Sequence, residues 1–397
     1  MLSYEQALKK ILEHTFPLKP RLLPLRESLG LVLAENLFSP EPFPVFDNSA
    51  VDGYAVVSGP VKKKEKSQLK VVGEIRAGEF FKESLKPGEA LRIFTGAPVP
   101  KGADAVVMQE HVARVNGTLS LLNRPKPKEN IRFRGEDFSK GKLLIRKGTL
   151  LEPAHLALLR AVGREEAPVY PLPTVSILAT GSELLREGEP VTLGKIRDSN
   201  SILLEALVKK TGGIPQRLPS VGDEPGEIRS AIRKGLKENL LLISGGVSVG
   251  KYDFVKGILR KEGVREIFWK VNIKPGKPLF FGKKRGTLVF GLPGNPVSVF
   301  VTFEEFVKPA LLKMRKRPLM RKEIKGYLTD SFRNGPRLHF VRVRSVPKKK
   351  RYAITPLKGQ GSHMIGTLAQ ANSLLRVEPN VLLKRNQKVS VELLREK

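Results

Sequence analysis

The feature that most constrains the fold of this chain is an alternation of short apolar runs with helical patterns between residues 173 and 319. The runs TVSILA, LLLIS and TLVFG are apolar along their whole length, as strands covered on both faces are. Helical patterns lie at about 201–210, 225–237 and 254–262, and a long helix follows the last run to about Lys308. This alternation predicts a central, doubly wound parallel α/β domain.

The flanking regions predict β-structure. Between residues 47 and 139, short strand-like runs such as GYAVV and ADAVVM are separated by turns, which indicates a β-rich domain. After about Met320 the pattern is again that of strands. In HFVRVRSV, Val341 and Val343 alternate with Arg342 and Arg344, so we expect a strand with one basic face in a small C-terminal β domain.

The first residues predict a helix over Tyr4–His14, in which Ser3 and Gln6 can form a capping box. The proline-rich stretch Pro40–Pro44 is typical of a linker. A further helix is expected over residues 153–163, with proline in its first turn.

Composition excludes several kinds of site. The chain has no cysteine, which rules out disulfides, thiolate zinc sites and a cysteine nucleophile, and its five histidines are scattered. A bound metal is therefore expected to be hard and oxygen-liganded, with Mg²⁺ as the default. No apolar run reaches the ~18 residues of a membrane span, and the N-terminus lacks the apolar core of a signal peptide. We expect a cytoplasmic protein without a membrane partner.

The chain is strongly basic, with 71 Lys and Arg against 39 Asp and Glu, a formal net charge of +32. Such a charge attracts anions of every kind, nucleic acid included. Aromatic residues make up only 7%, and no zinc-finger or RNP-like motif is present. We therefore favour a solvated basic surface on a protein that binds small anionic ligands.

Three glycine-rich loops follow strands of the predicted sheet: Thr180–Glu183, Ser244–Gly250 and Gly291–Pro296. The carboxyl ends of parallel strands meet at one edge, where α/β proteins bind ligands, and glycines let backbone N–H groups approach a phosphate. Ordinary strand-to-helix turns would also explain each loop, because Asn295 is a good N-cap and Pro296 a good first helical residue. The candidate ligand-binding residues in these loops are Gly181, Gly245, Gly246, Ser248, Asn295 and Pro296.

Acidic residues accompany the same strand ends. Glu183, Asp223 and Asp253 can converge at this edge to hold a metal ion or orient water, and Asp223 and Asp253 are the expected metal ligands. Both aspartates also precede helical patterns, so helix capping is an alternative role.

A basic segment runs from Trp269 to Pro278. Pro275, Gly276 and Pro278 exclude a regular helix there, so Lys274 and Lys277 are expected on a stiff, irregular segment suited to binding an anion. A solvated surface turn is the alternative.

Taken together, these motifs resemble the molybdopterin molybdenumtransferases, the MoeA family, whose relatives include the C-terminal domain of gephyrin. The matching stretches run along most of the chain: Phe46–Ala55, Phe94–Pro100, Arg134–Asp137, Thr180–Glu183, Ser244–Gly250 with Asp253, Ile273–Pro278 and Gly291–Ser298.

The resemblance implies a homodimer of four-part subunits. The expected parts are an N-terminal and linker domain (1–46 with 140–172), an inserted β-rich domain (47–139), the α/β domain (173–319) and a small C-terminal β-barrel (320–397). It also implies that the enzyme inserts molybdate, or tungstate, into adenylylated molybdopterin with Mg²⁺-dependent release of AMP. The adenylyltransferase of the same pathway is an expected partner.

The resemblance further implies roles for individual residues. The expected catalytic residues are Glu183, Asp223 and Asp253 on the α/β domain, Lys270, Lys274 and Lys277 on its basic wall, and Asp52, Thr95 and Asp137 from the other subunit. Arg342 and Ser362 are expected to hold the oxyanion. Ser182 stands where the family commonly has an acid, which leaves the metal ligands less defined.

Two other functions remain open at the level of sequence. The α/β domain alone also resembles a molybdopterin adenylyltransferase, although that reaction requires none of the flanking β domains. A non-catalytic scaffold or nucleic-acid-binding protein is the other alternative, suggested by the net charge.

Overall fold

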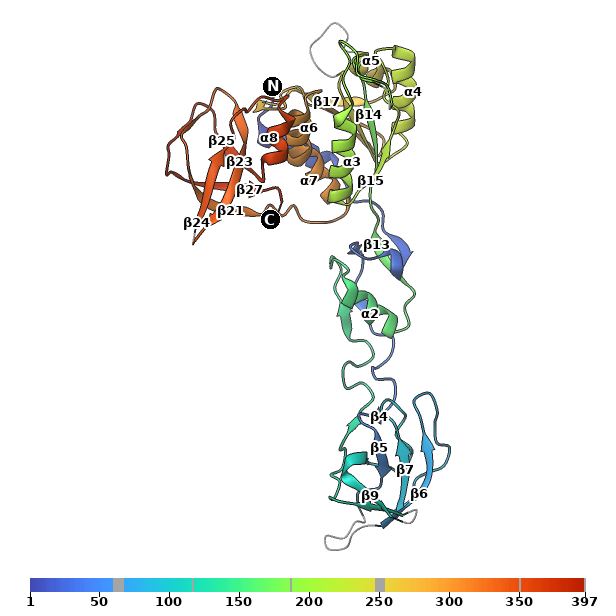
Figure 1. Ribbon diagram of the computed structural model, residues 1–397. Helices are drawn as coiled ribbons and strands as arrows, with labels where there is room; N and C mark the ends of the chain where they lie inside the picture. The colour runs from blue at the N-terminus through green and yellow to red at the C-terminus, as the bar shows by residue number, and fades with distance from the viewer. Residues whose placement is uncertain (60–67, 116–117, 186–187, 247–253, 350, 396–397) are drawn as a thin grey trace. The chain divides into compact units, whose positions relative to one another are not determined.

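The computed structural model describes residues 1–59, 68–115, 118–185, 188–246, 254–349 and 351–395. The chain divides into two compact units (Figure 1). The first contains Met1–Leu22 and Pro168–Lys397, and the second contains Leu23–Ala167.

The first unit contains a six-stranded sheet in the order β15-β14-β16-β20-β19-β17. Neighbours among β15, β14, β16 and β20 are parallel, as the alternating sequence pattern predicts, while β19 and β17 extend the sheet in antiparallel pairs. These two strands are missing from the sequence prediction. The strands are β14 (Thr174–Ala179), β15 (Ile214–Arg217), β16 (Leu240–Ser244), β17 (Arg265–Trp269), β19 (Phe280–Lys284) and β20 (Thr287–Leu292).

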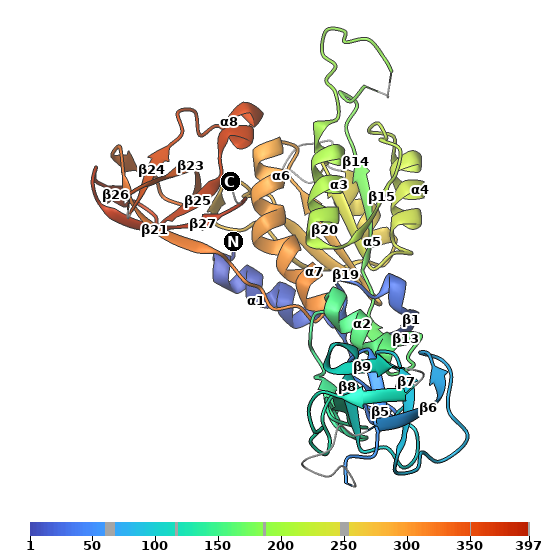
Figure 2. The ribbon, with the colours of Figure 1, turned by 60° about the horizontal axis from the view of Figure 1, so that its bottom comes forward.

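Helices cover both faces of this sheet (Figure 2). In β16, Leu240 and Leu242 pack with α3 and α6 on one face, whereas Leu241 and Ile243 pack with α4 and α5 on the other. Side chains alternate along a strand, so a wholly apolar run is what two covered faces require. The helices are α3 (Ser199–Thr211), α4 (Pro225–Gly235), α5 (Phe254–Lys261) and α6 (Pro296–Thr302).

Two further helical segments belong to the same core. Helix α1 (Tyr4–His14) begins with the predicted capping box, in which the Ser3 hydroxyl accepts the Gln6 N–H at 3.2 Å. The helix expected to end near Lys308 continues to Met314, because α6 passes through a π-helical turn, η3 (Phe303–Val307), into α7 (Lys308–Met314). None of the described helices combines the length and the apolar character that a membrane crossing requires.

The C-terminal part of this unit is a closed barrel. Strands follow the order β23-β24-β21-β27-β25, and β25 pairs back with β23. A sixth strand, β18 (Ile273–Lys274), runs parallel to β23 and connects the barrel to the segment that follows β17. The barrel strands are β21 (Glu323–Leu328), β23 (Leu338–Lys348), β24 (Arg351–Pro356), β25 (Ser373–Val377) and β27 (Lys388–Leu393).

The prediction that β23 has one exposed basic face is wrong in part. Arg344 is exposed, but Arg342 is completely buried, because residues 357–361 pack over it. The expectation of a solvated basic surface also fails at Arg315, which is 5% exposed and donates to the carbonyl of Thr211 at the end of α3.

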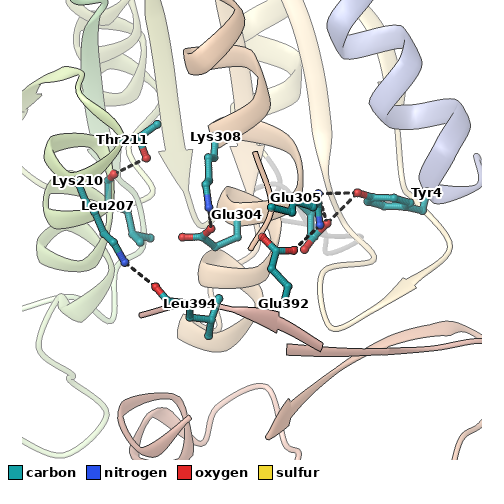
Figure 3. Close-up of polar contacts among 10 residues, drawn as sticks. Tyr4, Leu207, Lys210, Thr211, Glu304, Glu305, Lys308, Glu392 and Leu394 are labelled. Atoms are coloured by element: carbon teal, nitrogen blue, oxygen red, sulfur yellow. Dashed lines mark hydrogen bonds and ion pairs between the residues drawn. The ribbon is translucent and has the colours of Figure 1, made fainter. Parts of the chain in front are cut away.

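A buried polar cluster joins α1, η3 and the barrel (Figure 3). Arg321 donates to Glu305 at 2.7 Å and to Glu392 at 2.6 Å, and the Tyr4 hydroxyl donates to Glu305 at 2.8 Å. Burial and the adjacent carboxylate of Glu305 raise the pKa of Tyr4. Beside it, Lys210 donates to the carbonyl of Leu394.

The second unit is built on a six-stranded sheet in the order β8-β5-β7-β6-β10-β9. Its residues form two apolar clusters, one on each side, which include Tyr54 and Val56 on one and Ala55 and Ile93 on the other. Helix α2 (Pro153–Ala161) carries proline in its first turn, as predicted. The strands are β5 (Gly53–Val56), β6 (Gln68–Ile75), β7 (Glu89–Ile93), β8 (Ala105–Met108), β9 (Val112–Val115) and β10 (Thr118–Leu121).

Candidate active site

The loops that follow β14, β16 and β20 are in direct contact. The Thr180 N–H donates to Ser244 at 2.9 Å, and the Gly245 N–H donates to Leu292 at 3.2 Å. The Gly181 N–H donates to Val221 at 3.1 Å, which brings the turn before Asp223 to the same place. The prediction that these glycine-rich loops converge at one sheet edge is confirmed for their described residues, which in the second loop end at Gly246.

Glycine is required at the centre of this contact. Gly245 (φ +93°) and Gly246 (φ +62°) both adopt a left-handed backbone. A Cβ on Gly245 would lie 2.2 Å from the Thr180 carbonyl oxygen, and one on Gly246 would lie 2.5 Å from Val255. The two glycines therefore allow the loops to pack together. Ser248 and Asp253 lie outside the described residues.

Two of the predicted acids lie on these loops. The Asp223 carboxylate accepts the Ser182 hydroxyl at 2.7 Å and the Ser182 N–H at 3.2 Å, and the Asp223 N–H donates back to that hydroxyl at 3.1 Å. The carboxylate of Glu183 lies over Gly181, where an added Cβ would be 2.4 Å from Oε2. Ser182 thus fixes the position of Asp223 on the turn before α4.

Asn200 is a polar residue of this edge that the sequence analysis missed. Its Nδ2 donates to the Ser244 hydroxyl at 2.9 Å and to the Gly294 carbonyl at 2.6 Å, which ties α3 to two of the loops. Its Oδ1 and the Thr180 Oγ1 are buried without a hydrogen-bond partner among the residues that the structure describes. Its position two residues after Asp198, the N-cap of α3, was the available sequence signal.

The predicted lysines follow a strand that ends at the same edge. Strand β17 is antiparallel to β19, which is antiparallel to β20, so β17 runs in the direction of β20, β16 and β14. Lys270 directly follows it with a left-handed backbone (φ +74°). Lys274 and Lys277 are exposed, while Pro275 and Gly276 between them are buried. The prediction that these lysines stand on a constrained segment is confirmed.

A loop of the barrel reaches the same region. Asn295 is the N-cap residue of α6, but its side chain makes no capping bond and donates instead to the Ser362 hydroxyl at 3.0 Å. Pro296 is the first residue of the helix, and the next N–H, of Val297, donates to the Ser362 carbonyl at 3.1 Å. Asn295 and Ser362, predicted separately, therefore lie together.

The buried Arg342 side chain anchors the barrel loop that contains Ser362. Its guanidinium donates to Gly359 at 2.9 Å and to Gly361 at 3.1 Å and 3.2 Å, whereas its buried Nε has no hydrogen-bond partner in the described part of the chain. Burial lowers its pKa to about 10, so it remains charged at neutral pH. Arg342 thus fixes the backbone next to Ser362 and adds a buried positive charge.

His339 lies in the same basic region. It pairs with Lys274 across β23 and β18 and is 2% exposed. Burial, together with the charges of Lys274 and Arg342, lowers its pKa to about 3. The neighbouring charges of Lys274 and Arg342 give this region a positive field, which favours an anion.

The remaining predicted residues belong to the second unit. Asp52 accepts the Thr95 N–H at 2.8 Å and the Thr95 hydroxyl at 2.7 Å, and these bonds lower the pKa of Asp52. Asp137 is exposed, and its N–H donates to the Phe43 carbonyl at 3.1 Å. Asp52 and Thr95 therefore form a pair, while Asp137 is anchored separately.

Comparison with known protein families identifies three matching regions. Residues 2–163 match the MoeA N-terminal region (domain I and II), residues 176–313 a probable molybdopterin binding domain, and residues 325–394 the MoeA C-terminal region (domain IV). The chain belongs to the MoeA family of molybdopterin molybdenumtransferases. It is an enzyme of molybdenum cofactor biosynthesis.

Individual relatives agree with this assignment. The molybdopterin molybdenumtransferase of Haemophilus influenzae is 37% identical over 95% of both chains. That of a Nostoc species is 41% identical over 72% of this chain and 67% of its own. A crystal structure of the molybdopterin biosynthesis MoeA protein from Pyrococcus horikoshii is 30% identical, covers 100% of both chains and superposes with a TM-score of 0.83.

Proposed function

We propose that this enzyme inserts molybdate, or tungstate, into adenylylated molybdopterin and releases AMP in an Mg²⁺-dependent step. The single observation that carries the proposal is the joining of three surfaces at one sheet edge. Carboxylates lie on the loops after β14 and before α4, lysines follow β17, and the Asn295–Ser362 contact brings in the barrel loop held by Arg342.

The chemistry of the two substrates fits the separation of basic and acidic groups in this site. Molybdate is a tetrahedral dianion, which ammonium, guanidinium and hydroxyl donors bind and carboxylates repel. Lys274 and Ser362 offer such donors, and the buried charge of Arg342 supports them. The proposed oxyanion site is therefore at Lys274 and Ser362.

The acids suit a metal ion bound together with phosphate. Mg²⁺ usually takes one or two protein carboxylates and fills its other positions with water and substrate phosphates. Glu183 and Asp223 supply two hard oxygen donors, in keeping with the absence of a larger His, Cys, Asp or Glu cluster among the described residues. Asp253 is the third proposed ligand. When bound, Mg²⁺ would neutralise charge on the pyrophosphate.

The protein's own residues would then position the substrate. Gly245 and Gly246 let the loops after β14 and β16 pack closely. Beside them, Thr180 and Asn200 offer oxygens, without partners among the described residues, to hydroxyl or amine groups of the substrate. Lys270 and Lys277 would face the negative charge that develops as the P–O bond breaks.

We further propose a homodimer, in which Asp52, Thr95 and Asp137 serve the cleft of the second subunit. The exposed Asp52–Thr95 pair is suited to that role, because its carboxylate is ionised and held in one orientation. The adenylyltransferase that supplies the nucleotide substrate is the proposed partner protein.

The test is the release of AMP from adenylylated molybdopterin by the purified enzyme. AMP should appear only when both molybdate (or tungstate) and Mg²⁺ are present. Release that is indifferent to the oxyanion would contradict the proposal. Consumption of ATP with bare molybdopterin would instead identify an adenylyltransferase.

A further inference from the structure

Trp269, the single tryptophan of the chain, carries two lysines on its ring. The Lys256 Nζ lies 3.4 Å from the ring centroid and the Lys270 Nζ lies 3.8 Å from it. An ammonium group at such a distance is attracted by the electron-rich face of the indole. Trp269 therefore holds two mobile side chains in fixed positions.

This arrangement lies at the ligand-binding edge of the sheet. Trp269 is the last residue of β17, which ends at the same edge as β14, β16 and β20. One strand, β19, separates β17 from β20, so their ends are about 10 Å apart at the usual strand spacing. Lys256 reaches the ring from α5, and Trp269 packs against the apolar cluster that α5 forms with α4 and the sheet.

The backbone of Lys270 is strained in a way that keeps its side chain here. A left-handed φ of +74° is unfavourable for lysine and persists only where the surroundings fix it. The Lys270 N–H donates to Leu279 at 3.0 Å, and its carbonyl accepts the Leu2 N–H at 3.4 Å. Strain that is held by contacts on both sides is typical of functional positions.

A simple ion pair accounts poorly for the position of Lys256. Its partner Glu266 is 3.7 Å away and more exposed than the lysine, with 38% of its side chain accessible against 23%. A partly exposed pair at this distance contributes little to stability. It also leaves unexplained why the ammonium lies closer to the indole than to the carboxylate.

We propose that Lys256 is a further substrate-binding residue, which together with Lys270 on Trp269 binds phosphoryl oxygens of the nucleotide substrate. The identification of the anion as a phosphoryl group rests on the proposed function. Lysine is a compact charge well suited to phosphate, and two lysines ordered on one ring lose little conformational entropy when the anion arrives. No bond is made or broken by either lysine.

The single tryptophan makes the proposal directly measurable. Inorganic pyrophosphate is titrated into the full-length protein at constant ionic strength, and the emission of Trp269 is recorded. The wild type should show a saturable change. Lys256→Gln should weaken the apparent affinity about tenfold, as the loss of one charged contact does, and Lys256→Arg should retain most of it.

Two matched controls separate binding from structure. Lys261→Gln removes a charge from the last turn of the same helix and should leave the titration unchanged. Glu266→Gln breaks the ion pair but keeps Lys256 on the ring, so affinity should be retained or improved. A Lys256→Gln titration equal to that of the wild type would overturn the proposal. A loss in Glu266→Gln as large as in Lys256→Gln would also overturn it, as would a wild type without a saturable change.

AMP release, measured separately, distinguishes the two proposals. Normal molybdate-dependent AMP release by Lys256→Gln, with an unchanged KM for the nucleotide, would remove Lys256 from the site and leave the proposed function intact. A wild type that releases no AMP but titrates through Lys256 would keep the phosphate site and refute the proposed reaction.

Discussion

Two polar clusters of the first unit contrast sharply. The cluster around Arg321 is largely buried, and its polar groups have partners inside the protein: Glu305 and Glu392 each accept from the guanidinium, and Tyr4 donates to Glu305 (Figure 3). At the edge around Ser244, by contrast, two buried oxygens, on Thr180 and Asn200, lack partners among the described residues.

The difference separates stabilising polar groups from those available to a ligand. Buried polar groups normally find partners inside the protein, so a matched network such as that of Arg321 orders the fold. Unmatched groups cost free energy and are retained where a ligand or water completes them. Substitutions in the first cluster should therefore affect stability, and those at the sheet edge should affect activity.

The largest effect is expected for Arg321→Ala. Removing one partner of a buried charge network costs about 3–5 kcal/mol, because Glu305 and Glu392 are left without a counter-ion. Burial already raises the pKa of Glu392. Denaturant unfolding measures the loss. Arg376→Ala, which removes exposed ion pairs to Glu5 and Glu378, should cost less than about 1 kcal/mol. Equal losses in the two variants would remove the contrast.

The second largest effect is expected for Asp223→Asn, which should lower activity without lowering stability. Asp223→Asn keeps an oxygen for the Ser182 hydroxyl but removes the charge, so AMP release should fall about 10²–10³-fold while the unfolding midpoint stays close to that of the wild type. Glu224→Gln, the adjacent exposed acid, is the control and should be nearly as active as the wild type. Normal turnover in Asp223→Asn would take this acid out of the site.

The buried His339 should make the free energy of unfolding depend on pH. Its pKa is about 3 when folded and 6.5 when exposed, so the unfolded chain binds the proton more readily. The associated stability is complete above pH 6.5 and is lost as the pH falls towards 3; between pH 7 and pH 5 the loss is about 2 kcal/mol. His339→Gln should lack this part of the pH dependence in urea unfolding. Parallel pH profiles for the two proteins would refute it.

Ser182→Ala should have the smallest effect. It removes the two hydroxyl contacts to Asp223 but leaves the backbone N–H contact, so AMP release should fall about fivefold, the equivalent of about 1 kcal/mol. Ser182→Thr, which keeps the hydroxyl, should restore most activity. A thousandfold loss in Ser182→Ala would make the serine itself part of the chemistry.

The sequence predicted the regular elements well, because local patterns determine them. The apolar runs of β14, β16 and β20 and the capping box of α1 each carry a local signal. The antiparallel strands β19 and β17 were missing from the prediction. The four-part division with boundaries near 46, 139, 172 and 319 stays a prediction.

The candidate site was predictable in its residue types and less so in their contacts. Glycines and acids at strand ends indicated the edge. Asn200 and Lys256 were missed because their importance comes from partners far away in sequence, Gly294 and Trp269. The burial of Arg342 depends on the loop at residues 357–361, which an alternating strand pattern cannot reveal.

The central claim is that the sheet edge and the barrel loop form one oxyanion site. Calorimetry of molybdate binding tests it in the wild type, Lys274→Ala and Ser362→Ala, which alter the two surfaces separately. We predict one molybdate per chain in the wild type and weakened binding in both variants. If either variant binds molybdate as the wild type does, the two surfaces are not one site.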